Sequence, residues 1–308
     1  MAFSLVRDFK DNYRGILHTK NGAKTSFADH KSINFGNLAN LSKRLKRKKI
    51  ISHLVNLMNN NEQNTINNGF NVETKHLSLA SNQTELQKEL LSLEERQTTS
   101  GFKFGIVVCQ PGQTSDNELF GNECGGQEYE EFLDLLGDRI ELMGWQHYSA
   151  GLDVRNNSTG THSLYTDYQG NEVMFHVSTM LPFDTRADSQ QIERKRQIGN
   201  DICVVVFNQG KDIYNPNIIT SQFNHIVIVV TVIDSETYQV SLSCKDGVAL
   251  PIDPPIPFQG RVQKQEIRDW LLTKLINAEM HSLQAPSFSQ KISRTRETLL
   301  KYFIEQYL

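Results

Sequence analysis

Apolar and polar positions follow a regular pattern from about residue 101 onward, and there they predict a sheet. The apolar runs typical of buried strands are Phe104–Cys109, Ile202–Phe207, His225–Val232 and Tyr238–Cys244. The segment IVIVVTVI around the third run has little polar alternation. This indicates that other layers cover both faces of the sheet.

A hairpin and three amphipathic helices complete this region. Ser163–Tyr168 and Glu172–Thr179 flank a Gln-Gly pair and predict a β-hairpin. Pro111–Glu118 is expected to be a loop, and Gly137 to cap the first helix. The apolar stripes of the helices are Tyr129, Phe132, Leu133 and Leu136, then Ile267, Trp270, Leu271, Leu275 and Ala278, and finally Ile292, Leu299, Leu300 and Phe303. Helices and strands that alternate around an apolar sheet predict an α/β domain.

Residues 1 to about 100 are polar and have a weaker pattern, and the composition changes at Gly101. Arg14–Thr19, Thr74–Leu79 and Leu90–Leu93 are typical of short strands, residues 36–58 of a helix, and the Asn-rich tract 59–70 of a loop. The cationic run Lys43–Lys49 could attract an acidic membrane surface. A solvated helix face is the simpler interpretation of it.

Composition is that of a soluble globular protein with room for two domains. The chain has 308 residues, of which 38% are hydrophobic and 22% charged. Its net charge of −3 gives no general attraction to nucleic acid, and no apolar run reaches the roughly 18 residues that span a bilayer. The start of the chain lacks the apolar stretch of a signal peptide. Cys109 and Cys203 lie in apolar runs, where reduced thiols are ordinary. We therefore expect a cytoplasmic location.

Motifs of small-molecule catalysis are missing from the sequence. It has no G-x-x-x-x-G-K-[ST] phosphate loop, no H-E-x-x-H and no G-x-S-x-G. The separations of the four cysteines match no metal site. His176 alternates with apolar residues in a strand and is interpreted as a structural histidine.

The stretch Gln191–Phe207 joins a charged segment to a buried strand. Gln191–Gln197 is typical of a helix, and a Gly-Asn-Asp corner separates it from the strand. Because Gly-Asn between a helix and a strand is ordinary turn chemistry, these residues alone indicate that Asn200 is a helix cap or turn residue.

Five segments together resemble the Rap GTPase-activating protein family. They are FKFGIVVCQPGQTS (102–115), GTHSLYT (160–166), FHVSTMLP (175–182), RKRQIGND (194–201) and WLLTKLINAE (270–279). The resemblance covers most of residues 100–305. It implies an α/β (α+β) fold, with a G-domain-like mixed sheet flanked by helices and a smaller β-rich N-terminal domain. The domains would be 1–100, resembling the family's dimer-forming region at its end, and 101–308, the catalytic domain with both C-terminal helices. A homodimer is thereby expected.

The resemblance also implies an activator of a Rap-type small GTPase. Such activators insert an asparagine, the Asn thumb, into the GTPase and use no arginine finger. The matching residue is Asn200. The protein would need no cofactor of its own, because GTP and Mg²⁺ belong to the GTPase. Rheb or Ral as the partner, or a catalytically silent scaffold of the same fold, are the alternatives.

Further contacts with the GTPase are implied for residues around the thumb. Arg194, Lys195, Arg196 and Gln197 precede it on the same helix, and Gln197 stands where relatives usually have histidine. The three cations could equally form a solvated face held by salt bridges. Gln113 and Asp116 of the QTSD loop and Arg294 of the last helix complete the candidate set: Gln113, Asp116, Arg194, Lys195, Arg196, Gln197 and Arg294. The alternative for Gln113 and Asp116 is that they are ordinary polar residues of a turn. For Arg294 the alternative is an ordinary surface cation.

Overall fold

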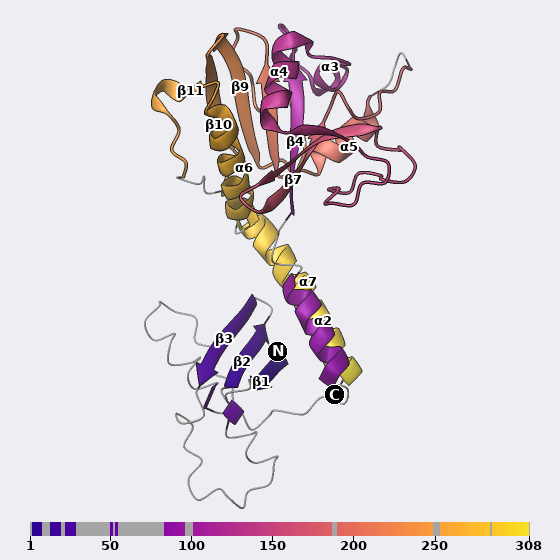
Figure 1. Cartoon of the computed structure of the whole chain (residues 1–308), viewed down its shortest axis with the longest axis vertical. Coiled ribbons are helices and arrows are strands. Elements are labelled where there is room, and N and C mark those ends of the chain that lie inside the picture. The colour runs from indigo at the N-terminus through magenta and orange to yellow at the C-terminus, as the bar shows by residue number, and fades with distance from the viewer. Residues whose placement is uncertain are drawn as a thin grey trace, which may run out of the picture. The chain divides into compact units, whose positions relative to one another are not determined.

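The computed structural model of the chain divides into two compact units, which are described separately. Unit 1 comprises Met1–Thr98 and Ser289–Leu308, and unit 2 comprises Thr99–Phe288. Figure 1 shows both units with many of their elements labelled. The structure describes residues 2–7, 13–19, 22–28, 50–51, 53–54, 83–95, 101–186, 190–248, 253–283 and 285–307.

The described part of unit 1 contains an antiparallel three-stranded sheet and helical segments. The strands are β1 (Ala2–Arg7), β2 (Tyr13–Thr19) and β3 (Gly22–Ala28), in the order β1-β2-β3. The strand predicted at Arg14–Thr19 is therefore confirmed. The predicted helix 36–58 is helical at the four residues that are described. Its cationic run Lys43–Lys49 and the predicted strand Thr74–Leu79 lie outside the described residues.

The strand predicted at Leu90–Leu93 is wrong, because these residues lie in helix α2 (Gln83–Glu95). Leu86, Leu90 and Leu93 fall at helical spacing and face the end of helix α7 (Pro286–Tyr307). The contacting residues of the two helices are Leu90, Leu93, Leu300, Phe303 and Tyr307. Most of α7 groups with unit 1, and the domain boundaries 1–100 and 101–308 stay a prediction.

Unit 2 is built on an eight-stranded mixed sheet in the order β11-β10-β9-β8-β4-β7-β6-β5. Strands β7, β4, β8 and β9 are parallel and central, and antiparallel strands flank them on both sides. The strands are β4 (Gly101–Cys109), β5 (Asp138–Glu141), β6 (His162–Tyr168), β7 (Asn171–Val177), β8 (Cys203–Asn208), β9 (Ile226–Asp234), β10 (Thr237–Cys244) and β11 (Arg261–Gln263). The predicted strands and the hairpin of this region are confirmed.

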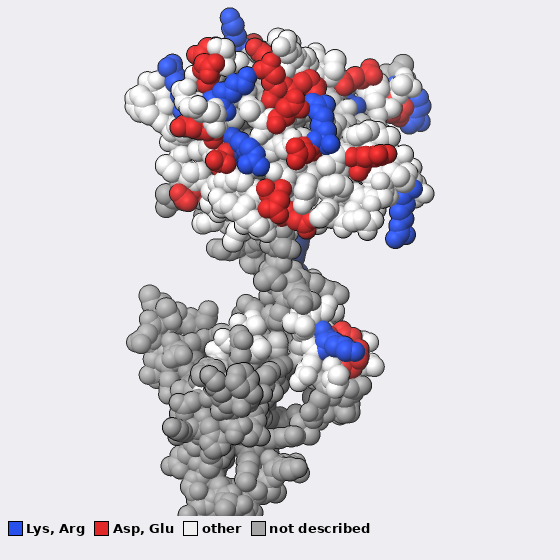
Figure 2. All heavy atoms as spheres, viewed as in Figure 1, with Lys and Arg blue, Asp and Glu red and all other residues white. Residues whose placement is uncertain are grey.

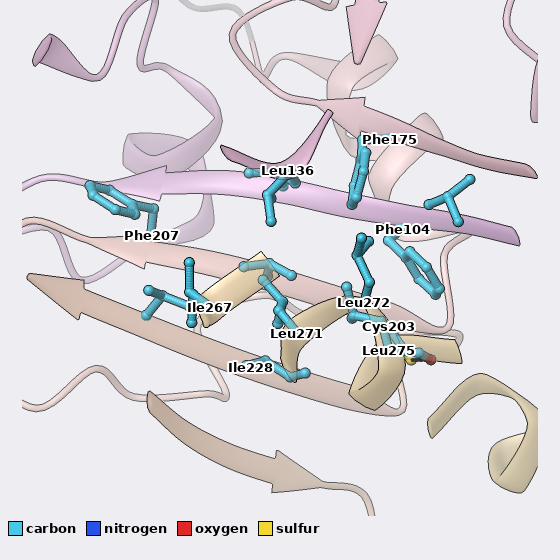
Figure 3. Packing of buried hydrophobic residues seen from close by; sticks show 14 of the residues in the cluster. Phe104, Leu136, Phe175, Cys203, Phe207, Ile228, Ile267, Leu271, Leu272 and Leu275 are labelled. Atoms are coloured by element: carbon cyan, nitrogen blue, oxygen red, sulfur yellow. Dashed lines mark hydrogen bonds between the residues drawn. The ribbon is translucent and has the colours of Figure 1, made fainter. Parts of the chain in front are cut away.

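Helices cover both faces of this sheet. On one face lie α4 (Gly126–Leu136), which Gly137 caps as predicted, and α6 (Ile267–Leu283). Figure 3 shows Leu271 and Leu275 of α6 over the strands that carry Cys203 and Ile228. On the other face lie α3 (Asp116–Phe120) and α5 (Ile192–Gly199). The segment predicted as a loop therefore contains the start of a short helix. A 3₁₀ turn, η3 (Phe258–Gly260), precedes β11. None of the described helices is long and apolar enough to cross a membrane.

A glycine in the central strand β4 allows α5 to lie close to the sheet. A Cβ atom at Gly105 would lie 2.8 Å from Ile198 Cγ2 and 3.2 Å from Asp201 Oδ2. Both neighbours are fully buried, so neither can move away easily. The glycine thus determines how near the C-terminal end of α5 comes to the sheet.

Gly105→Ala is expected to lower the free energy of unfolding by about 1–3 kcal/mol, because the added methyl group overpacks this contact. Urea denaturation measures the loss. Gly199→Ala is the matched control, since its Cβ would meet only Ser221 atoms at 3.8 and 3.9 Å. The control should be as stable as the wild type or slightly more stable. Equal stability of Gly105→Ala and the control would contradict the close approach.

Candidate functional site

Helix α5 is fixed at its start by a glutamine. Gln191 precedes the helix with left-handed backbone angles (φ 50°, ψ 47°) and is buried. Its side-chain amide bonds the backbone of Asp184 twice, accepting from the N–H at 3.0 Å and donating to the carbonyl at 2.8 Å. This pair of hydrogen bonds holds the point where the chain enters the helix.

Arg194 is a buried structural residue, so the expectation that it lies on an exposed basic face is wrong. Its side chain is 1% exposed. The guanidinium donates to the carbonyls of Phe120 at 2.9 Å, Asn122 at 2.7 Å and Leu181 at 3.2 and 3.3 Å. It also lies 4.9 Å from the ring centroid of Phe183. Arg194 thus joins α5 to the end of α3 and to the segment that follows β7.

A signal for this burial was present in the sequence. Ile198, four residues after Arg194, is fully buried against the sheet. Residues four apart share a helix face. The single apolar residue of the RKRQIGN segment therefore marks the buried face, and Arg194 lies on it.

Lys195 and Asp116, two candidates from separate segments, form an ion pair. Lys195 Nζ lies 3.0 Å from Asp116 Oδ2 and donates to Asn117 Oδ1 at 2.5 Å. Both charged side chains are about one quarter exposed. The pair links α5 to α3 at the surface. A contact of either residue with a partner stays a prediction.

Arg196 is the cation of α5 that faces outward. Its side chain is 59% exposed, and its guanidinium donates to Glu193 Oε2 at 2.6 Å. Gln197 beside it is half-buried. Arg294 is exposed on α7, among the residues of unit 1. The roles of these residues toward a partner remain predictions.

Gln113 is tied into its own loop. Its side chain forms a reciprocal amide pair with Asn122 (2.8 and 2.9 Å) and also accepts from the backbone of Gln110 at 2.9 Å. Asn122 in turn is buried and donates to the Val108 carbonyl at 2.9 Å. The loop after β4 is therefore preformed, and turn polarity explains Gln113 without a partner.

Asn200 ends helix α5 and is exposed. Its backbone N–H donates to the Gln197 carbonyl at 3.2 Å, and its side-chain Nδ2 donates to the Arg196 carbonyl at 2.8 Å. The cap predicted from the residues alone is thus confirmed. The amide atom that faces a carbonyl has to be the donor Nδ2, so the other atom of the amide is the acceptor Oδ1. Within the part of the chain that the structure describes, Oδ1 accepts no hydrogen bond from the protein.

A buried polar cluster lies directly after Asn200. The Asp201 carboxylate is fully buried; His176 Nδ1 donates to its Oδ2 at 2.9 Å, and Lys103 Nζ lies 3.3 Å from its Oδ1. The prediction of a structural His176 is confirmed. Sequence reasoning assigned no role to Asp201 or Lys103, because a partner on another strand is not visible in a local pattern.

Glu279 of α6 belongs to the same cluster. It is buried, and burial raises the pKa of its carboxyl to about 8, with a further contribution from the Asp201 carboxylate. Its Oε2 makes no hydrogen bond within the described residues. Burial and the Asp201 carboxylate thus both favour the protonated form of Glu279.

The site offers neither a metal centre nor a broad field of one charge. Among the described residues, no group of three or more histidine, cysteine or acidic side chains could hold a metal ion. Figure 2 shows acidic and basic side chains interspersed over one face of unit 2. What remains at the end of α5 is an exposed amide on a rigid backbone, in a mixed sheet covered by helices.

Comparison with known proteins identifies the class of this fold. The Rap/ran-GAP family model matches residues 119–297. The solved GAP domain of TSC2 is similar in structure, with a TM-score of 0.53 and 27% identity, over 59% of this chain and 97% of that chain. The chain therefore belongs to the Rap/Ran-GAP family, whose name and fold support a GTPase-activating role.

Two curated relatives extend the match. A PH and Rap-GAP domain-containing protein of Dictyostelium discoideum is 60% identical over the whole of this chain, which covers 26% of that protein. The human GTPase-activating Rap/Ran-GAP domain-like protein 3 is 45% identical over 70% of this chain and 22% of its own length. The chain thus spans about a quarter of the length of these relatives.

Arg194→Ala is expected to lower the free energy of unfolding by roughly 3 kcal/mol or more, because each buried carbonyl left without a donor costs about 1–3 kcal/mol. Arg196→Ala on the same helix should change it by less than about 0.5 kcal/mol, since an exposed ion pair contributes little. Urea denaturation of the two variants makes the comparison. Similar losses in both would show that Arg194 does not act as a buried link.

Removing the Glu279 carboxyl is expected to flatten the dependence of stability on pH. The folded pKa of about 8 lies above the ordinary value of 4.5, so the folded state holds the proton more tightly. This tighter proton binding stabilises the folded state fully below pH 4.5. The stabilisation then decreases by about 1.4 kcal/mol per pH unit as the pH rises toward 8. Glu279→Gln keeps the shape without the titration. Urea denaturation between pH 5 and 9 should show a smaller decline for the variant, and parallel curves would contradict the assignment.

Proposed function

We propose that this chain stimulates GTP hydrolysis by a Rap-type small GTPase, with Asn200 placed into the active site of the partner. The observation that carries the proposal is the state of this side chain. It is exposed, its Nδ2 is held by the helix, and its Oδ1 accepts no hydrogen bond from the described residues. Its place at the end of α5, in a domain of the Rap/Ran-GAP family, supports this role.

The chemistry of a carboxamide fits the task of holding a water molecule. Oδ1 of Asn200 can accept a hydrogen bond from the water that attacks the γ-phosphate. One Nδ2 hydrogen is used by the Arg196 carbonyl, and the second can donate toward the phosphate. The group carries no charge, so its contribution is positioning of the nucleophile in line with the phosphate.

Arg194 is poorly suited to act as an arginine finger, because it is buried and donates to backbone carbonyls. Arg196 is exposed and pairs with Glu193. We assign the catalytic contribution to the amide of Asn200 and not to a cation. In this proposal GTP and Mg²⁺ are held by the GTPase, and the chain needs no cofactor of its own.

Glycine at position 199 leaves room for a partner next to the thumb. It lies in the last turn of α5, and its neighbours would tolerate a Cβ atom at ordinary contact distance. The fold of this chain therefore does not itself require glycine there. Close approach of another protein to the backbone explains the residue.

Rap is the proposed partner because the segments GTHSLYT and LLTKLINAE resemble activators of Rap more than activators of Rheb or Ral. A catalytically silent scaffold is the alternative from another class, and the features that favour it are Gln197 and the poor match of the first hundred residues to the family. We also propose a homodimer, a cytoplasmic location and recruitment to membranes through Lys43–Lys49.

Asn200→Ala is expected to reduce the stimulated rate of GTP hydrolysis by about 10³-fold, comparable to loss of other groups supplied in trans. Affinity for the GTPase should stay within a few-fold, because one small side chain is removed from a larger interface. Single-turnover hydrolysis with GTP-loaded Rap, Rheb and Ral measures the rate. Gln222→Ala, which shortens another exposed amide of unit 2, is the control and should be fully active.

Each outcome separates the hypotheses. A fully active Asn200→Ala variant would contradict the assignment of Asn200 as the Asn thumb. A wild-type protein that binds but accelerates none of the three GTPases would favour the scaffold. Acceleration of Rheb or Ral alone would correct the choice of partner and leave the mechanism intact.

A further inference from the structure

The end of α5 has backbone carbonyls that the helix itself cannot satisfy. The last four carbonyls of any α-helix lack intrahelical donors and need other partners. Asn200 satisfies the first two, with its side chain on the Arg196 carbonyl and its backbone N–H on the Gln197 carbonyl. The Gly199 carbonyl remains, together with the second lone pair of the Ile198 carbonyl, which already accepts from the Asp201 N–H at 3.1 Å.

Two side chains from the segment before β9 satisfy them. Asn224 Nδ2 donates to the Ile198 carbonyl at 2.9 Å, and Ser221 Oγ donates to the Gly199 carbonyl at 2.5 Å. Asn224 Nδ2 also donates to the Asp201 carbonyl at 2.6 Å. These three hydrogen bonds hold the backbone on both sides of Asn200 while its own side chain stays exposed.

The backbone of Asn200 needs such support. Its angles, φ −95° and ψ 1°, lie in the sparsely allowed bridge region between helix and strand. Both hydrogens of one planar NH₂ group on Asn224 bind the carbonyls of Ile198 and Asp201. Their separation is thereby fixed, and with it the turn that carries Asn200.

The surroundings of the two supporting residues differ. Asn224 is 3% exposed, so water cannot easily replace the hydrogen bonds of its Nδ2, and its Oδ1 has no hydrogen-bond partner among the described residues. Ser221 Oγ accepts from the Phe223 N–H at 3.0 Å, and Lys245 Nζ donates to the Ser221 carbonyl. The support therefore reaches from the turn to the end of strand β10.

We propose that Asn224 and Ser221 are positioning residues that keep the Asn200 amide in its working place. This rests on the proposed function of Asn200. A displacement of about 1 Å in a catalytic group can lower a rate by roughly 100-fold. Loss of the Asn224 amide removes two of the three hydrogen bonds that Ser221 and Asn224 donate to the turn. Because Asn224 is buried, the exposed surface around Asn200 keeps its side chains.

The test separates turnover from binding. In Asn224→Ala, kcat for stimulated hydrolysis should fall about 10- to 100-fold. KM for the GTPase, and affinity for it loaded with a non-hydrolysable GTP analogue, should stay within about three-fold. Circular dichroism and urea denaturation give the folded fraction to which kcat is normalised. Gln222→Ala lies between the two positioning residues and is the matched control, with unchanged kcat and KM.

Ser221 supplies an independent pair of variants. Ser221→Ala should lower kcat by less than Asn224→Ala, because Ser221 is partly exposed and water can replace its hydroxyl. Ser221→Thr keeps a hydroxyl and should restore kcat. If Asn224→Ala does not fold, this pair decides the matter: a loss in Ser221→Ala that Ser221→Thr restores supports the proposal.

Two results would overturn the inference. One is an unchanged kcat in folded Asn224→Ala or, where that variant does not fold, in Ser221→Ala. The other is a loss fully explained by the unfolded fraction. Failure of the proposed function is distinct, because it shows as full activity of Asn200→Ala. Loss of activity in Asn200→Ala with full activity in folded Asn224→Ala would keep the thumb and reject its positioning residues.

Discussion

The buried guanidinium of Arg194 is the interaction on which the arrangement of helix α5 depends. It bonds three backbone carbonyls from two segments that are more than fifty residues apart in sequence, near Phe120 and Leu181. A planar guanidinium presents several donors at fixed angles, so it sets the position as well as the energy of the contact. Burial lowers the pKa of this group, yet an arginine remains charged in proteins. The carbonyl dipoles therefore have to compensate a full charge, which explains why three of them converge on it.

The three consecutive cations of α5 show what a sequence can and cannot reveal. Successive residues of a helix point about 100° apart, so Arg194, Lys195 and Arg196 cannot all face one partner. In the structure the first is buried, the second pairs with Asp116, and the third is exposed. The sequence established a basic helix, but the choice among these directions depends on α3 and the segment after β7. Helix α3 lies more than seventy residues before Arg194 in the chain, and how the segment after β7 folds back on α5 is not visible in the local pattern.

Prediction from sequence succeeded where burial on both faces leaves an unmistakable signal. The central strands β4, β8 and β9 are continuous apolar runs, and the sequence located all three. It failed for Leu90–Leu93, where a short leucine run suits a strand or a helix equally and the packing partner lies about two hundred residues away on α7. It could not show Asn224 beneath the turn, because an asparagine before a strand has no local signature of its bonds to a distant helix.

An exposed amide can position a water molecule only if the turn that carries the amide is held in place. A neutral amide gains little from long-range attraction, so its effect on a water molecule depends on short, directed hydrogen bonds. Such bonds weaken steeply with misalignment, and a flexible loop would lose much of the benefit to its own entropy. The carbonyls around Asn200 accept from Ser221, Asn224, the Asp201 N–H and Asn200 itself. Among the described residues, Oδ1 of Asn200 has no donor and is an available hydrogen-bond acceptor. A charged arginine finger could tolerate looser placement, because the attraction of opposite charges falls off gradually with distance. The dense bonding of this turn is therefore what the proposed amide mechanism would require of its scaffold.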